Sequence, residues 1–504
     1  LLTELGEFTE IEEQAMTAMR EVRATGGIPQ IPAPTGLQAT LRHYQQAGLS
    51  WGWFLHRHGL GGILADDMGL GKTLQALSLM LQVKREQGSK PSLVVAPTSV
   101  LANGEREAER FTPEFKVVVW HGPDRKSYAE ELKSADLVLT SYALVRRDLE
   151  ALSEVNFRYV VLDEAQNIKN ADSATAQACK SIPSDYRLAL TGTPLENRLS
   201  ELWSLFDFLM PGFLGSADSF HERFEQPIQV AGDAAVRERL RMRIQPFIMR
   251  RLKTEVAKDL PPKTEMVAWC EMEPGQAGLY KEVLEESRRK VFDSIEKVGF
   301  KRSRVSILAA LMKLRQVCCD PRLLKLPPGT SLPGSAKLER FGGLVEDLIS
   351  EGHRALVFSQ FTEMLELLTQ SAKKMGYEYS YLDGRTRDRM ARVDAFNEPD
   401  GPPLFFISLK AGGTGLNLTA ADYVIHYDPW WNPAVEDQAT DRTHRIGQTR
   451  SVFAYKLITR GTVEEKILAL QRRKKELAAG VLGGDSDVGR VLPEQDVEDL
   501  FRME

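Results

Sequence analysis

The sequence predicts an α/β protein with two parallel-sheet lobes, and three observations support that prediction. Short apolar runs alternate with amphipathic stretches from Leu37 onward, which is typical of parallel strands joined by helices. This alternation stops after Leu199 and resumes near Ala355, so two such units are expected. Hydrophobic residues form 42% of the 504 residues, which is enough apolar material for more than one core.

The first lobe is predicted over residues 37–200. Residues 1–36 precede it and are expected to form a Glu-rich helix followed by a linker rich in proline and glycine. Helical patterns separate most of the apolar runs, as a parallel sheet requires. The expected strands of this lobe are the apolar runs at 60–64, 93–96, 116–120, 137–140, 159–162 and 187–190.

Helical segments are predicted between the two lobes. Leu202, Leu205, Phe206 and Leu209 recur at helical spacing, so residues 201–262 are predicted as a helical insertion and an inter-lobe linker. Residues 263–334 are predicted as the start of the second lobe, with a second helical insertion inside them.

The main part of the second lobe is predicted over residues 335–461. Its expected strands are the apolar runs at 355–359, 378–382, 404–408, 423–426 and 452–457. Thr462 followed by Glu465 is a capping-box pattern, which predicts that a helix begins there and covers 462–480. Residues 481–504 are an acidic tail.

Composition excludes several classes of protein. No apolar run approaches the roughly 18 residues that a membrane-spanning helix needs. The four cysteines form no CxxC pair, so neither a disulfide framework nor a His/Cys metal site is indicated. The formal net charge of −5 gives no hint of a nucleic-acid partner. Because the first residue is Leu, the chain is expected to be a fragment of a longer protein.

The strongest local motif is the glycine-rich stretch 65–73, which follows an expected strand and precedes a helical pattern. Such a turn directs backbone N–H groups and a helix N-terminus at one point, which suits a phosphate. Lys72 is predicted to reach the β- and γ-phosphates of ATP, and Thr73 to offer its hydroxyl to Mg²⁺. An ordinary glycine-rich turn is the alternative, since Asp66 stands where the usual pattern has glycine. The other predicted ATP contacts of this loop are Asp67, Met68, Gly69, Leu70 and Gly71.

A second motif follows the apolar run 159–162. Asp163 and Glu164 come at the carboxyl end of that expected strand, which is where parallel sheets bind ligands. Asp163 is predicted to hold Mg²⁺ together with Thr73, and Glu164 to orient or deprotonate the attacking water. The alternative is a solvated acidic turn.

These two segments resemble motifs I and II of superfamily-2 helicases. More narrowly, the chain resembles the SWI/SNF-type ATPases, which are double-stranded-DNA translocases of chromatin remodelling and related bacterial enzymes. The resemblance covers about residues 41–475 and implies two RecA-like lobes with ATP and Mg²⁺ as cofactors. Further motifs appear in the family's order at 41–45, 191–197 (motif III), 357–361 (motif IV), 381–384, 408–418 (motif V), 428–433 (Asp-Pro-Trp-Trp-Asn-Pro) and 438–448 (motif VI).

Three positions depart from the family pattern. Gln166 stands where His is common in motif II, and Glu196 where Gln is common in motif III. Both departures resemble prokaryotic members. Gly104 follows Asn103 where the family usually has Trp, so the sequence lacks an aromatic anchor in that segment.

The resemblance implies further roles around the nucleotide. Gln45 is expected to contact the adenine and Gln438 to bind ATP. Arg442 and Arg445 are three residues apart, so on a helix they would share a face and reach the γ-phosphate from the second lobe. Salt bridges on the same helix are the alternative for this pair. The residues expected to couple hydrolysis to movement are Gln166, Thr191, Gly192, Thr193 and Gly415.

The resemblance also implies contacts with duplex DNA through hydroxyls, amides and one lysine, which suit phosphates rather than bases. The alternative is that these side chains are satisfied locally. Arg250, Arg251 and Lys253, in a basic stretch at 237–253, are expected either to contact duplex, to regulate lobe closure or to form a solvated helix face. The expected DNA contacts are Thr98, Thr140, Ser141, Ser359, Gln360, Lys410, Thr414, Asn417 and Trp430.

The sequence therefore predicts a DNA-dependent ATPase that translocates along double-stranded DNA and remodels protein–DNA complexes without separating the strands. The alternatives are a strand-separating helicase, an RNA polymerase-recycling ATPase and an ATP-binding scaffold without turnover. Duplex DNA and DNA-bound proteins, including RNA polymerase, are the expected partners of a monomeric motor without membrane contact. It is expected in the cytoplasm at the nucleoid of a prokaryote, or in the nucleus of a eukaryote.

Overall fold

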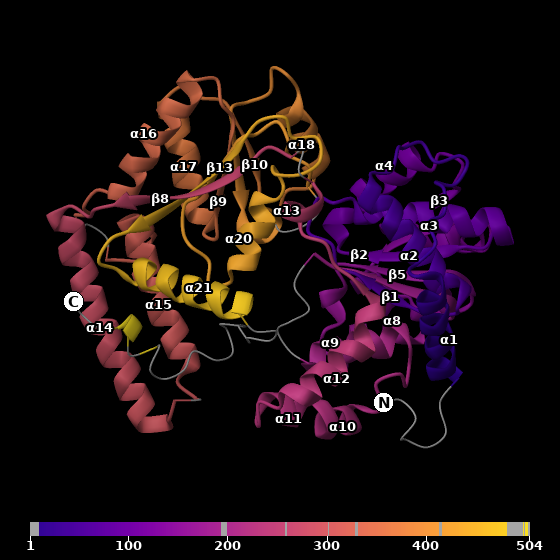
Figure 1. Ribbon diagram of the computed structural model, residues 1–504. Coiled ribbons are helices and arrows are strands. Elements are labelled where there is room, and N and C mark those ends of the chain that lie inside the picture. The colour runs from indigo at the N-terminus through magenta and orange to yellow at the C-terminus, as the bar shows by residue number, and fades with distance from the viewer. Residues whose placement is uncertain are drawn as a thin grey trace. The chain divides into compact units, whose positions relative to one another are not determined.

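The chain folds into two compact units, Leu1–Lys258 (unit 1) and Asp259–Glu504 (unit 2). The computed structural model describes residues 10–192, 199–257, 260–300, 302–327, 331–412, 416–480, 497 and 499–501. Across these residues, no helix combines the length and the apolar character that a membrane crossing requires. Each unit is built around its own parallel sheet (Figure 1).

Unit 1 contains a seven-stranded parallel sheet in the order β3-β4-β2-β5-β6-β1-β7. All six predicted strands are confirmed, and β7 is a seventh that the sequence pattern did not indicate. The seventh strand has only two residues inside a stretch with helical periodicity, which is too short for an alternation signal. The strands are β1 (Gly62–Leu64), β2 (Ser92–Ala96), β3 (Val117–Trp120), β4 (Leu137–Ser141), β5 (Phe157–Asp163), β6 (Ser184–Leu190) and β7 (Ile248–Met249).

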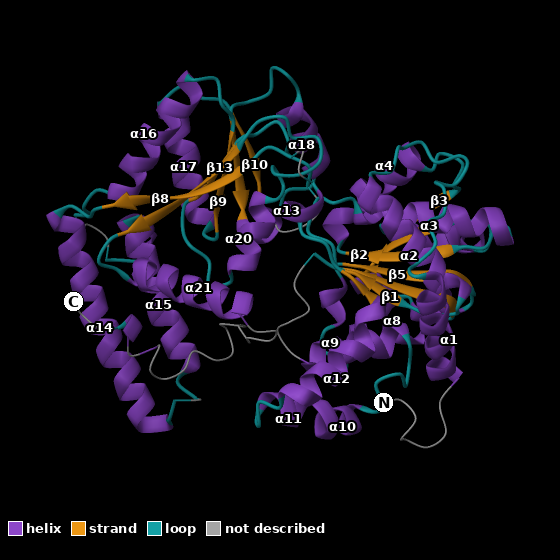
Figure 2. Cartoon of the chain, in the orientation of Figure 1, coloured by secondary structure: helices purple, strands orange, loops and turns teal. Residues whose placement is uncertain are grey.

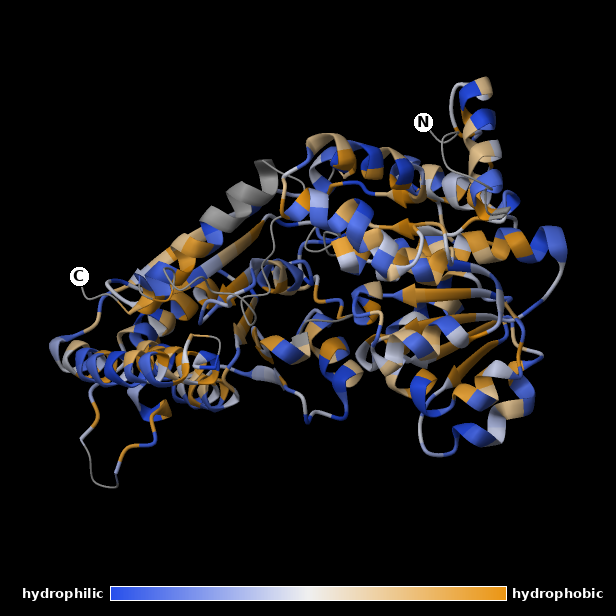
Figure 3. Cartoon of the chain, turned by 90° about the horizontal axis from the view of Figure 1, so that it is seen from below, coloured by the Kyte–Doolittle hydropathy of each residue, from blue (hydrophilic) through white to orange (hydrophobic). Residues whose placement is uncertain are grey.

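Helices cover both faces of this sheet (Figure 2). On one face α2 (His43–Arg57) and α4 (Leu101–Phe111) pack against α3 (Lys72–Gln87), and on the other α8 (Ala174–Ser181) packs against α9 (Leu199–Leu209). Because both faces are covered, most residues of the central strands are apolar, as the hydropathy colours show (Figure 3). The remaining helices are α1 (Glu10–Thr25), α5 (Ala129–Leu132), α6 (Tyr142–Arg147), α7 (Leu149–Ser153), α10 (Ala217–Phe220), α11 (Gln226–Gln229), α12 (Ala234–Ile244) and α13 (Lys253–Val256).

Unit 2 contains a six-stranded parallel sheet in the order β10-β11-β9-β12-β13-β8. The five predicted strands are confirmed. The additional edge strand, β8, is exposed along its first half, so its sequence lacks the apolar run of a buried parallel strand. The strands are β8 (Lys263–Cys270), β9 (Ala355–Ser359), β10 (Tyr379–Leu382), β11 (Leu404–Ser408), β12 (Tyr423–His426) and β13 (Val452–Thr459).

Two apolar cores lie on opposite faces of the second sheet. Val357 joins the core that holds α16 and α17, whereas its neighbours Leu356 and Phe358 join the core that holds α18 and α20. This division follows the two-residue period of a strand. The predicted fold, two parallel-sheet lobes with helical insertions, is confirmed. The helices of unit 2 are α14 (Pro274–Val298), α15 (Arg304–Cys319), α16 (Ala336–Ser350), α17 (Thr362–Lys374), α18 (Arg389–Asn397), α19 (Leu409–Gly412), α20 (Pro433–Thr440) and α21 (Val463–Gly480).

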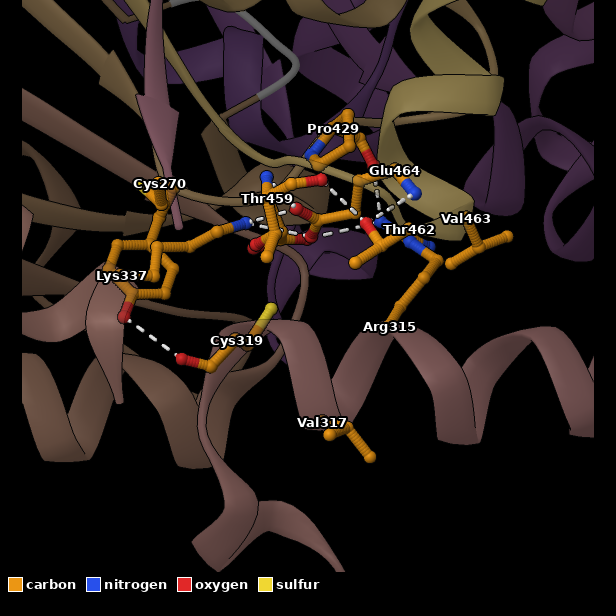
Figure 4. Close-up of polar contacts among 12 residues, drawn as sticks. Cys270, Arg315, Val317, Cys319, Lys337, Pro429, Thr459, Thr462, Val463 and Glu464 are labelled. Atoms are coloured by element: carbon orange, nitrogen blue, oxygen red, sulfur yellow. Dashed lines mark hydrogen bonds and ion pairs between the residues drawn. The ribbon is translucent and has the colours of Figure 1, made fainter. Parts of the chain in front are cut away.

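The long helices α14 and α15 pair and form a third apolar core with the start of α21. A buried ion pair lies at the same place: the Lys337 Nζ is 2.6 Å from Glu464 Oε2, and both side chains are fully buried (Figure 4). The backbone N–H of Thr459 also donates to Glu464. The predicted helix start after Thr462 is confirmed, and Glu465 accepts from the N–H of Gly461. These contacts fix the helical insertion and α21 to the sheet of unit 2.

Candidate nucleotide site

Three adjoining strands of unit 1 end side by side and create the candidate site. β6 lies between β1 and β5, and Leu190 pairs in register with Leu64 on one side and Asp163 on the other. The segments that follow these three strand ends are therefore neighbours. They contain the predicted phosphate loop, the Asp163-Glu164 pair and Thr191-Gly192. The carboxyl ends of a parallel sheet are the usual place for such a ligand site.

The phosphate loop turns through two glycines in the left-handed region, Gly69 at φ 82° and Gly71 at φ 78°. Other residues adopt this region at a cost, which explains the glycines. Helix α3 begins at Lys72, and its ammonium donates to the backbone carbonyls of Asp66 (2.7 Å) and Asp67 (3.4 Å). The loop, the helix N-terminus and the lysine are thus assembled as the sequence predicts for a phosphate-binding turn.

Side chains around the loop leave little free space. Gln45 is buried, donates to the Leu70 carbonyl at 3.1 Å and accepts from the N–H of Arg42 at 2.9 Å. A Cβ on Gly192 would lie 2.6 Å from the Met68 side chain and 3.3 Å from Lys72 Nζ, so only glycine fits beside the loop there. The predicted adenine contact of Gln45 stays a prediction, because its amide is bonded to the loop in this structure.

Glu164 has an unusual backbone conformation. Its φ of 52° is the one positive value found for a non-glycine residue within the described ranges, and its side chain is 8% exposed. A residue held in this region stores strain of roughly 1–3 kcal/mol, which persists only where neighbours fix it. The Tyr142 hydroxyl donates to the Asp163 carbonyl at 2.8 Å, and the Asn167 amide donates to the Glu164 carbonyl at 2.8 Å.

A hydrogen-bonded chain connects Glu164 with the end of β6. The Gln166 amide donates to Glu164 Oε2 at 2.9 Å, and the Thr191 hydroxyl donates to Gln166 Oε1 at 3.1 Å. Gln166 and Thr191, two of the predicted coupling residues, are therefore in direct contact. Gln166 can serve in this chain because its amide both donates and accepts. Thr193 and Gly415 lie outside the described residues.

The carboxyl of Asp163 lies in a setting that favours its neutral form. Burial, followed by the charge of Glu164, raises its pKa to about 7, while the Lys72 ammonium opposes that shift. Asp163 and Thr73 both line a small cavity of about 30 Å³ between the sheet and helices α3 and α4, whose other lining residues are mostly apolar. A hydroxyl and one carboxylate are hard oxygen donors that suit Mg²⁺ alongside phosphate oxygens. No group of three or more His, Cys, Asp or Glu side chains with metal-site geometry occurs among the residues that the structure describes.

Sequence reasoning missed a buried network behind the loop. Asp66, which takes the place of the usual glycine, is fully buried and ion-paired with Arg251. Gln75 of α3 bonds to both of them. For Arg251 and Lys253 the alternative of a solvated helix face is wrong: the Arg251 side chain is 13% exposed, and Lys253 is buried. The signal that could have found the network is Asp66 itself, since a buried acid needs a cationic partner.

The two arginines of motif VI belong to unit 2, and they do not lie on a helix as predicted. Helix α20 ends at Thr440, and a series of turns carries Arg442 and Arg445 instead. Arg442 is 5% exposed, and its carbonyl accepts from the Leu418 N–H at 3.1 Å. Arg445 donates to the Leu416 carbonyl at 3.4 Å. After the helix ends at Thr440, these two hydrogen bonds hold the turns against residues 416–418. Gln438 is partly exposed on α20.

The predicted DNA contacts of unit 1 divide into exposed and buried side chains. Thr98 is exposed at the start of a short 3₁₀ turn, Thr98–Val100. Thr140 is fully buried and donates to the Trp120 carbonyl at 3.0 Å, and Ser141 is 2% exposed. The hydroxyl of Thr140 is therefore used inside the protein in this structure, and its contact with DNA stays a prediction.

The predicted DNA contacts of unit 2 also divide into exposed and buried side chains. Lys410 and Asn417 are exposed, and Thr414 lies outside the described residues. Ser359 is 1% exposed and donates to Asp428, which also accepts from the N–H of Gln360 at 3.3 Å. The backbone N–H of Trp430 donates to Glu436 Oε1 at 2.6 Å.

Asp428 is the centre of a cluster that holds the Asp-Pro-Trp-Trp-Asn-Pro stretch. Arg315 of α15 lies 3.3 Å from it, and the guanidinium lies 5.6–5.9 Å from the ring centres of Trp430, Trp431 and Phe361. These polar and aromatic groups stabilise the stretch from within unit 2.

Comparisons with known proteins identify the family of this chain. The SNF2-related domain model matches residues 44–323, and the helicase conserved C-terminal domain model matches 336–447. A Bacillus subtilis protein, provisionally named an ATP-dependent helicase/translocase, is 40% identical over 98% of this chain. The ATPase of the ISWI chromatin-remodeling complex of Saccharomyces cerevisiae is 37% identical over 88% of it. This chain spans about half the length of such curated relatives, 54% of the first and 41% of the second.

A solved structure of similar sequence is the Sulfolobus solfataricus SWI2/SNF2 ATPase core in complex with dsDNA. It is 39% identical, with a TM-score of 0.48, over 94% of this chain and 100% of that one.

Proposed function

This chain belongs to the SNF2-related domain family, and on that premise we propose that it is a DNA-dependent ATPase that translocates along double-stranded DNA and remodels protein–DNA complexes without separating the strands. One observation carries the ATP-hydrolysis part of the proposal. Lys72, Asp163 and Glu164 converge at the ends of adjoining strands, close enough for the charges of Lys72 and Glu164 to change the pKa of Asp163. A cation beside two carboxylates at a phosphate-binding turn suits phosphoryl transfer to water.

Each residue of the site has a proposed chemical role. Lys72 binds the β- and γ-phosphates, and Thr73 with Asp163 holds Mg²⁺. When bound, Mg²⁺ neutralises charge on the phosphate oxygens. Glu164 orients the attacking water and accepts its proton. Arg442 and Arg445 of unit 2 stabilise the charge that develops on the γ-phosphate.

Coupling between hydrolysis and movement is proposed to use the contact of Glu164 with Gln166 and Thr191. A change at Glu164 during hydrolysis alters the acceptor of the Gln166 amide, and Gln166 is bonded in turn to Thr191 at the end of β6. A switch of this kind needs a discrete rearrangement that both ends sense.

Duplex DNA is the proposed substrate, and DNA-bound proteins such as RNA polymerase are the proposed targets. Thr98, Lys410 and Asn417 are exposed and carry groups that bind backbone phosphates. Phosphate contacts do not read the base sequence, which suits movement along any duplex. The exposed positions favour these three residues over the buried Thr140 and Ser359 as direct contacts.

The substrate is tested by measuring phosphate release with duplex DNA, single-stranded DNA and RNA at one stated salt concentration, because salt sets the affinity. We expect duplex DNA to stimulate hydrolysis most. Displacement of a triplex-forming third strand reports translocation, and separation of a plain duplex reports unwinding. Unwinding of the plain duplex would replace the proposed function with that of a strand-separating helicase.

The catalytic residue is tested with Glu164→Gln. We expect kcat to fall by about 10²–10⁴-fold, since general-base catalysis contributes that much, while ATP binding remains. Glu130→Gln is the matched control, because the Glu130 side chain is 90% exposed on α5. DNA-stimulated phosphate release that survives Glu164→Gln would show that another group is the base.

A further inference from the structure

The segment that follows β7 lies directly against the phosphate loop. The Ala65 N–H donates to the Met249 carbonyl at 2.7 Å, and the Asp67 N–H donates to the Arg251 carbonyl at 3.1 Å. The Lys253 N–H donates back to Asp67 Oδ2 at 2.9 Å. Residues 249–253 therefore form a backbone partner along one side of the loop, although about 185 positions separate them from it in the sequence.

The Arg251 side chain strengthens this contact through the Arg251 network, which consists of Tyr44, Asp66, Gln75 and Arg251. Its guanidinium forms a two-point pair with Asp66, one bond of which measures 2.8 Å from Nε to Oδ1. It also donates to Gln75 Oε1 at 2.7 Å and to the Tyr44 carbonyl. Because Asp66 is fully buried, removing the guanidinium would leave its carboxylate unpaired and costly.

The Arg251 network touches three parts of the nucleotide site. Asp66 belongs to the loop, and its carbonyl accepts from the Lys72 ammonium at 2.7 Å. Gln75 belongs to α3, whose N-terminus faces the loop, and Tyr44 precedes Gln45 on α2. Asp66 is therefore the single residue that connects the Arg251 guanidinium with the Lys72 ammonium.

Gly48 of α2 leaves the space that the Arg251 network needs. A Cβ there would lie 1.9 Å from Gln75 Oε1 and 3.0 Å from an Arg251 nitrogen. The Gln75 amide is bonded at both ends, so it cannot move aside without losing a partner. The packing of α2 and the Arg251 network depend on each other.

We propose that Arg251 is a positioning residue of the phosphate loop, and that its pair with Asp66 makes residues 249–253 part of the nucleotide site. Arg251 is not a contact for DNA. The inference rests on the proposed function, since it assumes that the loop binds ATP. Because these residues lead the chain out of unit 1, nucleotide binding and the conformation of this exit segment are coupled.

The test compares Arg251→Gln with the wild-type chain in two binding assays. We expect the Kd for a fluorescent ADP derivative, measured without DNA, to rise at least tenfold, and the KM for ATP to rise with it. The Kd for duplex DNA at a fixed salt concentration should change less than twofold. Arg241→Gln is the matched control, since Arg241 is a half-exposed arginine on α12, and both of its affinities should stay unchanged.

Two further variants keep the test decisive if Arg251→Gln does not fold. Arg251→Lys keeps the charge but cannot form the two-point pair, so its nucleotide affinity should be lower than that of the wild type. Gly48→Ala keeps both charges and displaces Gln75, so it should also weaken nucleotide binding. Thermal melting of each variant shows that it is folded. Unchanged nucleotide affinity in both folded variants would overturn the proposal.

The double variant Asp66→Asn/Arg251→Gln tests whether the pair acts as a unit. Removing both charges should weaken nucleotide binding no more than Arg251→Gln alone, because no buried charge is left unpaired. If the double variant weakened nucleotide binding by the product of the two single-variant factors, Asp66 and Arg251 would not act as a pair. An opposite pattern in Arg251→Gln, with DNA affinity reduced and nucleotide affinity intact, would make Arg251 a DNA contact. A wild-type chain that neither binds nor hydrolyses ATP would refute the proposed function instead.

Discussion

One group of polar side chains in each unit illustrates two different settings. In unit 1 Lys72, Asp163 and Glu164 lie beyond the carboxyl ends of adjoining strands, where Lys72 and Asp163 are partly exposed and Glu164 has a strained backbone. In unit 2 Lys337, Glu464 and His426 are enclosed, with at most 1% exposed, and each is bonded inside the protein. The first group is the one that we propose binds a ligand, and the second group stabilises the fold. The predictions below test that difference.

The largest effect is expected from Lys337→Met in unit 2. The variant leaves Glu464 charged, buried and without its cation, which should lower the free energy of unfolding by about 3–5 kcal/mol. Burial alone would lower the pKa of Lys337, but the charge of Glu464 raises it above its usual value, so the pair is ionised. Urea denaturation of the wild type and the variant measures the difference.

Two controls sharpen this prediction. Lys337→Met/Glu464→Gln removes both charges and retains an acceptor for the Thr459 N–H, so it should recover most of the loss. Lys290→Met removes the exposed partner of Glu286 on α14 and should cost less than about 1 kcal/mol. A double variant that is less stable than Lys337→Met would show that the pair is not the stabilising element.

A smaller, pH-dependent effect is expected from His426 of unit 2. Burial lowers its pKa to about 4, and its ring bonds to the Thr440 hydroxyl at 2.9 Å. Among the nearby charges, Glu436 and Glu265 raise the pKa of His426, while Lys456 and Lys263 lower it. The folded state therefore favours the neutral ring. The neutral ring contributes its full stabilisation above about pH 6.5. As the pH falls from 6.5 to 4 this stabilisation is lost, and the loss reaches about 3 kcal/mol.

The measurement is the unfolding free energy of wild type and His426→Gln across that pH range. The variant should show a shallower loss of stability, because Gln does not titrate. His56 of unit 1 provides the comparison between units, since burial also lowers its pKa to about 4. His56→Gln should flatten the transition of unit 1 only. Identical slopes for His426→Gln and wild type would contradict the assignment.

The parts of the fold that the sequence could predict are those with a local signal. Strands covered on both faces, such as β2 and β9, are short and apolar except for one terminal serine, so their positions are evident from the sequence. The phosphate loop and the Asp163-Glu164 turn follow such strands directly. These two segments lie close together because of the strand order, which puts β6 between β1 and β5.

The parts that could not be predicted depend on partners far away in the chain. Arg251 lies in a basic stretch whose usual explanation is a solvated face, and nothing local indicates that Asp66 is its partner. The end of α20 at Thr440 has no glycine or proline to mark it, so Arg442 and Arg445 were expected on the helix. Lys337 and Glu464 are likewise 127 positions apart. Pairing at such distances is fixed by packing and leaves no periodic pattern.

The smallest effect is expected at Gly104 of unit 1, where the sequence lacks the aromatic residue usual in its family. Gly104 is inside helix α4 and lines the small cavity between the sheet and helices α3 and α4, together with Asn103 and Thr73. A Cβ there would meet only Leu139 Cδ1, at 3.8 Å. Gly104→Ala should therefore raise the unfolding free energy by about 0.5–1 kcal/mol, because alanine favours the helix and loses less entropy on folding.

Thermal melting measures this gain, and Gly192→Ala is the opposing control in the same unit. A Cβ on Gly192 meets the Met68 side chain at 2.6 Å and Lys72 Nζ at 3.3 Å, so that variant should lose nucleotide affinity. Both changes add one methyl group within unit 1, yet one fills free space and the other displaces Met68 and crowds Lys72. Lower stability of Gly104→Ala would contradict this prediction. Lower nucleotide affinity would show that the candidate site needs the space of this cavity.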